Sequence, residues 1–180
     1  MKRTYTLAIY TANHIGMLNQ VSIIFTRRRI NIESITVSKS ELENIHRYTI
    51  VINDDELTVK KIAKQIEKQV DVHKSFYYTD DEIVSHEFAL FKLPTSSFTK
   101  ANAEDILRGH QATILAITEE YMVVEKSGYT HEIQDLYKAL EPFTILEYCS
   151  SGRVAISKRM KTLNTYLKEI GTKQDYSLNL

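Results

Sequence analysis

The feature that most constrains the fold is a repeated order of hydrophobic periodicities along the chain. Apolar and polar residues alternate over residues 3–10, which is the pattern of a half-buried strand. Over residues 16–28 the apolar positions recur at the spacing of one helix face. Two more alternating segments, 32–38 and 45–52, predict an antiparallel hairpin. A strand, a helix and then two strands are therefore expected in that order.

A second helix and a last strand complete the first unit. Asp55 is placed to cap the helix, and Glu56 adds favourable first-turn charge. Its inner face consists of Val59, Ile62, Ala63 and Ile66. Residues 70–78 form the last predicted strand, which gives the order β-α-β-β-α-β.

The same order starts again in the second half of the chain. Residues 85–93 alternate as a strand that Pro94 ends, and a short helix then ends at Gly109, the expected left-handed residue. The inner faces of the two predicted helices consist of Ala103, Ile106, Leu107, Ile133, Leu136, Tyr137 and Leu140. The remaining strands are predicted at 111–117, 121–126, 143–149 and 153–157.

The sequence therefore predicts an α+β protein with two ferredoxin-like βαββαβ domains. The predicted boundaries are residues 1–79 for the first domain, 80–84 for an acidic linker, 85–160 for the second domain and 161–180 for a helical or frayed tail. Each unit leaves one sheet face without helices. Because open faces and edge strands commonly recruit a second copy, a homodimer is expected.

Composition excludes several classes of partner. The chain has 23 Lys and Arg against 23 Asp and Glu, so no basic field attracts nucleic acid or a membrane. The start lacks a signal-peptide pattern, and a cytoplasmic location is expected. Cys149 is the single cysteine and is predicted to lie in the core. The six histidines show no metal-ligand spacing, so no metal site is predicted.

Two surface features allow more than one interpretation. The aromatic run at 76–78 could form a stacking platform for RNA, but packing is the preferred explanation because the basic-glycine-aromatic signature is absent. The arginines at 27–29 could contact a partner subunit, whereas a helix dipole also favours cations at a C-terminus. The structural explanation is preferred for both.

The segment most informative about function lies between the first strand and the first helix. A helix N-terminus presents unpaired amides to an anion, and Gly16 allows a ligand to approach the backbone closely. Asn13 can donate and accept hydrogen bonds, so the group suits both ends of a free amino acid. His14 is also placed for contact. From the order of the elements, Asn31 at the start of the second predicted strand is expected to lie adjacent to this loop. The alternative is that Asn13 caps the helix and Gly16 only forms a turn.

Two motifs in the first half give a family resemblance. The pattern Asn13-x-x-Gly16-x-Leu18, followed by the run 31–37 that begins Asn31-Ile32, resembles the ACT domain that opens acetolactate synthase small subunits. In the second half, the segments 106–109, 121–123 and 151–157 resemble the C-terminal domain of that family, and the likeness covers residues 3–160.

The resemblance implies a regulatory subunit of branched-chain amino-acid biosynthesis. Two ACT domains would pair, and valine or a related amino acid would be held between them by the loop 13–18 of one chain and by Asn31 of the other. Binding would control a large catalytic subunit by feedback, with coupling of ~1–3 kcal/mol. Thiamine diphosphate, flavin and magnesium would belong to that large subunit, and no cofactor is expected here. The implied ligand-binding residues are Asn13, His14, Ile15, Gly16, Met17, Leu18, Asn31 and Ile32.

The chain departs from the family pattern at two positions. Arg29 stands where a glycine usually ends the first helix, and a left-handed side chain there costs ~1–2 kcal/mol. Ile15 stands where a small residue is usual, which bears on the preferred amino acid. Two other function classes are a stand-alone amino-acid sensor and an enzyme. The enzyme is disfavoured because no nucleophile and base pair is evident.

Overall fold

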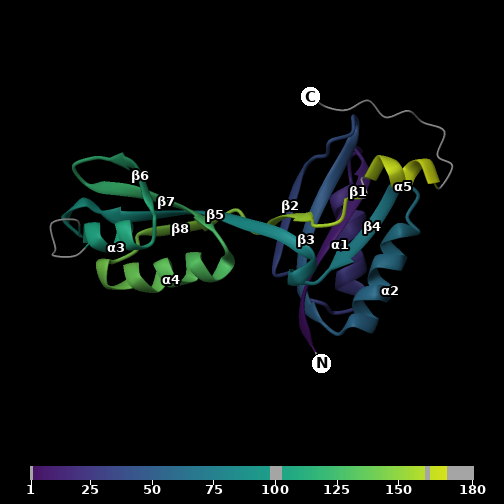
Figure 1. Ribbon diagram of the computed structural model, residues 1–180, viewed down its shortest axis with the longest axis horizontal. Helices are drawn as coiled ribbons and strands as arrows, with labels where there is room; N and C mark the ends of the chain where they lie inside the picture. Colours follow the sequence, from purple (N-terminus) through teal and green to yellow (C-terminus); the bar gives the residue numbers. More distant parts are fainter. Residues whose placement is uncertain (1, 98–102, 161–162, 170–180) are drawn as a thin grey trace. The chain divides into compact units, whose positions relative to one another are not determined.

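The computed structural model describes residues 2–97, 103–160 and 163–169, which fold into two compact units (Figure 1). The N-terminal unit contains the chain up to Val84 together with the described residues from Ala155 onward, and the C-terminal unit is Ser85–Val154. Each unit has one antiparallel sheet with helices, so the predicted α+β class with ferredoxin-like units is confirmed.

The grouping differs from the predicted boundaries at two places. Residues 80–84 are not a featureless connection: Asp80–Glu82 form a 3₁₀ helix whose capping box involves Thr79 and Glu82, and β5 starts at Ile83. Residues from Ala155 group with the N-terminal unit because they pack against its sheet. The predicted frayed tail at 170–180 lies outside the described residues.

The N-terminal unit has the sheet order β2-β3-β1-β4, with α1 and α2 on one face (Figure 1). Its elements are β1 (Arg3–Ala12), α1 (Met17–Arg27), β2 (Ser34–Lys39), β3 (Ile45–Asp54), α2 (Glu56–Glu67) and β4 (Val72–Tyr78). Strand alternation places Leu7, Ile9 and Ile50 in the core beneath these helices. Asp55 caps α2 as predicted, with its carboxylate accepting from the backbone N–H of Thr58 at 3.0 Å.

Helix α1 ends in a left-handed turn although no glycine is present. Arg29 has φ 56°, and Ile30 donates its N–H to the carbonyl of Phe25 at 3.1 Å, as in a Schellman motif. Arg28 contacts α2 through Gln65, whose Oε1 accepts from Nε at 2.9 Å. The left-handed turn is therefore present although Arg29 stands where the family usually has glycine, and Arg29 bears the strain of the positive φ.

The second face of this sheet is covered by the chain's own C-terminal residues. Here β9 (Val154–Ser157), which pairs with β5, leads to α5 (Leu163–Glu169). A buried cluster joins the two parts and consists of Ala8, Tyr10, Leu42, Ile45, Tyr78, Ile83, Ala155, Leu163 and Leu167. The expectation of a helix-free face is therefore wrong for the N-terminal unit, because a third helix reaches it from the far end of the chain.

Polar contacts hold this returning segment, defined as residues 155–160 and 163–169. Arg47 donates to the carbonyl of Ala155, and Arg159 pairs with Glu82 at 2.6 Å. The Tyr166 ring packs on Phe76 with centroids 4.8 Å apart. Burial here raises the pKa of Tyr10 to about 12. The N-terminal unit is thus a three-layer structure with helices on both faces of its sheet.

The C-terminal unit has the sheet order β6-β7-β5-β8 with α3 and α4 on one face (Figure 1). Its elements are β5 (Ile83–Pro94), α3 (Ala103–Gly109), β6 (Thr113–Ile117), β7 (Tyr121–Gly128), α4 (Thr130–Leu140) and β8 (Glu147–Ser150). Phe91, Val124 and Leu136 are fully buried in its core. The predicted hairpin and helices are confirmed, but the strand predicted at 143–149 begins only at Glu147.

Two sequence expectations for this unit are wrong. Gly109 is not the left-handed residue: it belongs to α3, and Gln111 takes that role with φ 53°. Ala112 donates to the carbonyl of Leu107 at 2.8 Å, so the turn repeats the one after α1. Cys149 is exposed rather than in the core, because its position on β8 places it on the sheet face away from the helices.

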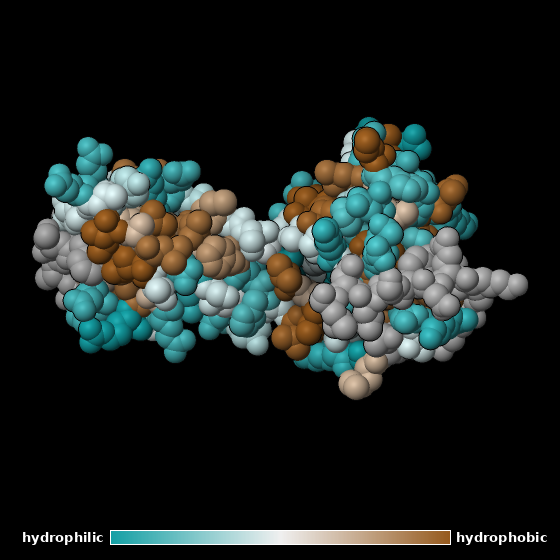
Figure 2. All heavy atoms as spheres, turned by 90° about the horizontal axis from the view of Figure 1, so that it is seen from above, coloured by the Kyte–Doolittle hydropathy of each residue, from teal (hydrophilic) through white to brown (hydrophobic). Residues whose placement is uncertain are grey.

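The helix-free face of the C-terminal sheet is apolar at its centre. Figure 2 shows hydrophobic residues gathered over this unit on the side away from α3 and α4. A shallow hollow on this face, which we call the open face, is lined by Leu90, Lys92, Tyr121, Val123, Glu147 and Cys149. The three buried clusters of the described residues all lie elsewhere. None of the described helices is long and apolar enough to cross a membrane.

Candidate functional site

The loop between β1 and α1 is held from both sides by backbone hydrogen bonds. Ala12 donates its N–H to the carbonyl of Asp71 at 2.9 Å, and Asn13 donates to that of Asn44 at 3.0 Å. These two acceptors belong to the turns before β4 and β3. The two hydrogen bonds therefore fix the loop at one end of the sheet, and the loop leads directly into α1.

The first turn of α1 has amides that the protein does not use. Gly16 is the N-cap residue with φ 89°, and no side chain caps the helix. The sequence alternative in which Asn13 caps α1 is therefore wrong. Within the described part of the chain, the N–H groups of Leu18 and Asn19 have no acceptor, and the first turn carries no acidic residue. These donors and the helix dipole favour an anion at this position.

Space is open around Gly16. A Cβ built on this residue would have no atom within 4 Å. A substitution here is consequently limited by the positive φ rather than by collision. The neighbouring Ile15 is also fully exposed, so a ligand held at these amides needs a further wall.

The predicted binding residues are not all equally available. Ile15 is fully exposed and Leu18 half exposed, so both offer apolar side chains to a ligand or a partner. Met17 is 1% exposed and packs in the core, which leaves only its backbone for binding. Ile32 also packs against this core. His14 is exposed, and its Nδ1 lies 3.6 Å from Asp71 Oδ1.

Asp71 is a charged neighbour of the loop that sequence reasoning missed. It touches the loop through its carbonyl to Ala12 and through its carboxylate near His14. Its position in the sequence is far from the motif, and no local pattern marks it. Only the pairing of β4 with β1 brings this carboxylate beside the loop.

Asn31 does not lie beside the loop in the same chain, contrary to the sequence interpretation. It follows α1, whose 11 residues span ~16 Å at 1.5 Å each. The sheet register gives the same result. Ser34, at the start of β2, pairs with Val51 near the end of β3, whereas Ala12, just before the loop, pairs with Ile45 at the start of β3. Asn31 and Gly16 therefore lie at opposite ends of the unit. The Asn31 side chain donates to Glu33 at 3.0 Å.

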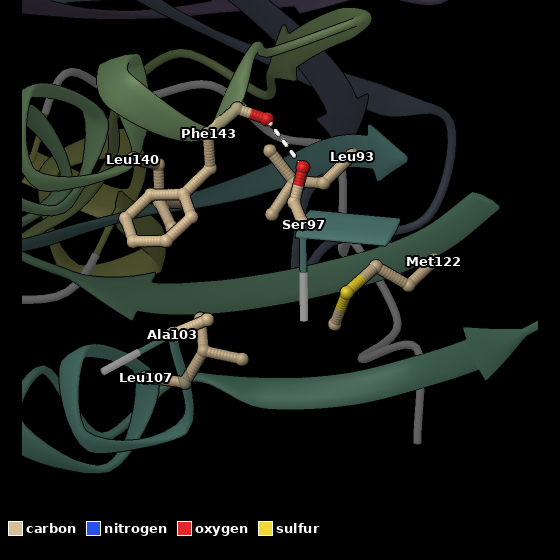
Figure 3. Close-up of a pocket in the computed structure, with 7 residues that line it drawn as sticks. All are labelled: Leu93, Ser97, Ala103, Leu107, Met122, Leu140 and Phe143. Atoms are coloured by element: carbon tan, nitrogen blue, oxygen red, sulfur yellow. Dashed lines mark hydrogen bonds between the residues drawn. The ribbon is translucent and has the colours of Figure 1, made fainter. Parts of the chain in front are cut away.

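A small apolar cavity in the C-terminal unit does not compete with this site. It is lined by Leu93, Ser97, Ala103, Leu107, Met122, Leu140 and Phe143 (Figure 3). Its volume is about 10 Å³, which is at the lower limit for one water molecule. The Ser97 hydroxyl donates to the carbonyl of Phe143 at 2.7 Å, so no polar group there calls for a ligand. This cavity is a packing gap.

The aromatic run at 76–78 is not a stacking platform. Phe76 and Tyr78 pack against the returning segment, and Tyr77 packs on the opposite face against the core of α1 and α2. The packing interpretation is confirmed. Among the described residues, no group of three or more His, Cys, Asp and Glu side chains is arranged to hold a metal ion.

The fold and the loop define an ACT-type module joined to a second ferredoxin-like unit. Residues 7–74 match the family model described as the AHAS small subunit-like ACT domain, and residues 86–159 match that of the small subunit of acetolactate synthase. The chain belongs to the family of acetolactate synthase small subunits.

Individual relatives agree over nearly the whole chain. The acetolactate synthase small subunit of Bacillus subtilis is 33% identical over 88% of this chain and 91% of its own length. That of Mycobacterium bovis is 30% identical over 91% of this chain and 97% of its own length. The crystal structure of the small subunit from Thermotoga maritima has a TM-score of 0.80 at 26% identity, covering 87% and 98% of the two chains.

Proposed function

We propose that this chain is a regulatory subunit that binds valine or a related branched-chain amino acid and controls a separate catalytic acetolactate synthase subunit. The observation that carries the proposal is the unused amide group at the start of α1, in a chain of this family. The amino acid's carboxylate accepts from these amides, with Asn13 and Asp71 close enough to the loop to meet the ammonium group.

A second copy supplies the missing wall. Because Asn31 and the loop lie at opposite ends of one unit, one chain cannot place both on one ligand. An antiparallel pairing of two β2 edges about a two-fold axis exchanges the ends. The Asn31 of one protomer then lies beside the Gly16 loop of the other, which makes two equivalent sites per dimer.

The β2 edge has the chemistry for such pairing. It is an edge strand of its sheet, and Ile35 and Val37 are exposed on the side of α1. Exposed apolar residues on an edge strand favour association with another strand. Leu18 and Ile15 add apolar surface at the loop end. This surface also selects an amino acid with an aliphatic side chain over a polar one.

Regulation follows from binding at the interface. An effector shifts the enzyme only through different affinities for two states of the complex, so an interface ligand that changes the dimer changes the bound catalytic subunit. The chemistry and its thiamine diphosphate, flavin and magnesium belong to the catalytic subunit in this proposal. The chain itself activates that subunit and confers feedback inhibition.

Calorimetry with valine, leucine and isoleucine tests the site. We expect Gly16→Asp to weaken binding by at least about a hundredfold, since its carboxylate takes the place of the ligand's acid group. Gly16→Ala is the matched control: it has the same backbone strain and no charge, and should retain most of the affinity. Equal affinities for Gly16→Asp and Gly16→Ala would reject the site.

Reconstitution tests the partner. Mixing the purified chain with the catalytic subunit should raise the rate of acetolactate formation, and valine should then lower it. Gly16→Asp should raise the rate but leave it insensitive to valine. Amino-acid binding without any effect on the synthase would instead identify a stand-alone sensor.

A further inference from the structure

The returning segment contacts two structures that hold the β1–α1 loop in place. One is the turn at residues 40–44 between β2 and β3, and the other is the end of β1 with the neighbouring part of β3. Helix α5 lies against the second face of this sheet, beside β1 and β4 (Figure 1). The matches to the family models end at residue 159, before α5, and they assign no role to this helix.

The first connection runs through the turn between β2 and β3. The carbonyl of Asn44, a residue with φ 59°, accepts the N–H of Asn13 at 3.0 Å. On either side of Asn44, Leu42 and Ile45 are fully buried in the cluster that contains the two leucines of α5. A shift of this turn must therefore be accommodated by α5, since a packed core has little free space.

The second connection runs through Arg47 of β3. Its Cζ lies 5.5 Å from the centroid of the Tyr10 ring, and its guanidinium donates to the carbonyl of Ala155. Tyr10 is close to the end of β1, where the loop begins. The Nε of Arg47 is buried without a hydrogen-bond partner among the described residues. This side chain is therefore sensitive to small shifts of the returning segment, because loss of the Ala155 carbonyl would leave a further N–H unpaired.

The returning segment is also tied to the start of β5. Lys158 donates its N–H to the carbonyl of Glu82 at 2.9 Å, and Arg159 pairs with the Glu82 carboxylate at 2.6 Å. Directly before these residues, β9 pairs with β5. The strand β5 runs without a break from Ile83 to Pro94 and forms part of the C-terminal sheet. One segment therefore contacts both the supports of the loop and the strand that leads into the other unit.

We infer that the returning segment transmits the occupancy of the β1–α1 loop to β5 and, through this strand, to the C-terminal unit. The inference rests on the proposed amino-acid site at the loop. Such transmission needs an element with two states that the ligand biases. Helix α5 fits this role because it has only seven residues and two buried leucines, so it can open locally without unfolding the unit. A ligand that restrains the loop and its turn favours the packed state of α5.

Hydrogen exchange of the full-length chain tests the step from the loop to α5. The probe is whichever of valine, leucine and isoleucine binds most tightly in calorimetry, added to saturation. The amides of residues 163–169 should then exchange at least about threefold more slowly, and Gly16→Asp should abolish this change. Amino-acid binding with unchanged exchange at 163–169 would overturn the inference and leave the proposed function intact. Absence of binding would reject both.

Two charge-matched variants test the step from α5 to β5. Arg159→Gln removes the pair with Glu82, whereas Lys168→Gln removes one positive charge from an exposed position of α5. In the free chain, both variants should bind the amino acid with a Kd within about threefold of the wild-type value. In the complex with the catalytic subunit, inhibition at saturation should be at least about fivefold smaller for Arg159→Gln and unchanged for Lys168→Gln. Equal inhibition with all three chains would overturn the inference, because β5 would then receive the effect without this pair.

Discussion

The two units share one fold but treat the second face of the sheet differently. In the N-terminal unit the returning segment buries Tyr10 and Tyr78, whereas in the C-terminal unit Leu90 and Val123 stay partly exposed. The covered unit also has the unused amides of α1 at its edge. The apolar residues on the second face of the sheet are thus buried by the chain itself in one unit and left partly exposed in the other.

The largest effect should come from removing the cover of the N-terminal unit. Leu167→Ala is expected to lower the free energy of unfolding of this unit by about 2–3 kcal/mol, because it leaves a cavity against Tyr10 and Tyr78. Val123→Ala, at low protein concentration, should lower that of the C-terminal unit by less than about 1 kcal/mol. Hydrogen exchange measured for the amides of each unit distinguishes them. Equal losses of unfolding free energy in the two units would show that the covered face and the open face do not differ in stability.

A smaller effect on the free energy of unfolding should appear at the two left-handed residues that follow α1 and α3. Arg29 and Gln111 have φ 56° and 53° at equivalent positions after α1 and α3. Replacing either with glycine should stabilise its unit by about 1 kcal/mol, since the strain disappears and part of the gain is lost to chain entropy. Urea unfolding measures both changes. The effects should be similar, and a gain in only one unit would show that the turns are not equivalent.

The smallest effect should be a pH dependence at two capping carboxylates. The backbone N–H of Thr79 lowers the pKa of Glu82, with a further contribution from Arg159, and the backbone N–H of Tyr129 lowers the pKa of Glu132. A folded pKa below the unfolded one gives stability above the unfolded value, ~4.3, that is lost as pH falls through the folded pKa. Both groups are largely solvated, so the effect is small.

The measurement is the unfolding midpoint of Glu82→Gln and Glu132→Gln against pH. Each variant should be less stable than the wild type near neutral pH and equal to it in acid. The difference should be larger for Glu82, which also pairs with Arg159 at 2.6 Å. A difference that persists unchanged in acid would assign the loss to packing rather than to charge.

Periodicity was enough to predict most of the fold. Alternation along β1 and the helical spacing in α1 and α2 identify the elements and their inner faces, because each has one buried side. The long-range cover by Leu163 and Leu167 was not predictable, since two leucines on a short helix do not specify which sheet they meet. For the same reason Cys149 was assigned to the core although it faces outward.

The candidate site was predicted in part. The motif around Gly16 locates the loop, and the structure explains why its amides are unused. Adjacency of Asn31 was inferred from the order of elements, and the register of β2 against β3 places it at the far end. Asp71 had no local signal, because its place beside the loop depends on a strand pairing distant in sequence.

Mixed dimers provide the most direct test of an effector site shared by two protomers. Gly16→Asp removes the loop half of both sites, and Asn31→Ala removes the other half, so neither variant alone should bind valine. A dimer with one chain of each kind, isolated with two different affinity tags, pairs an intact loop with an intact Asn31 once. Calorimetry should then show one valine bound per mixed dimer. No recovery of binding in the mixed dimer would contradict a shared site.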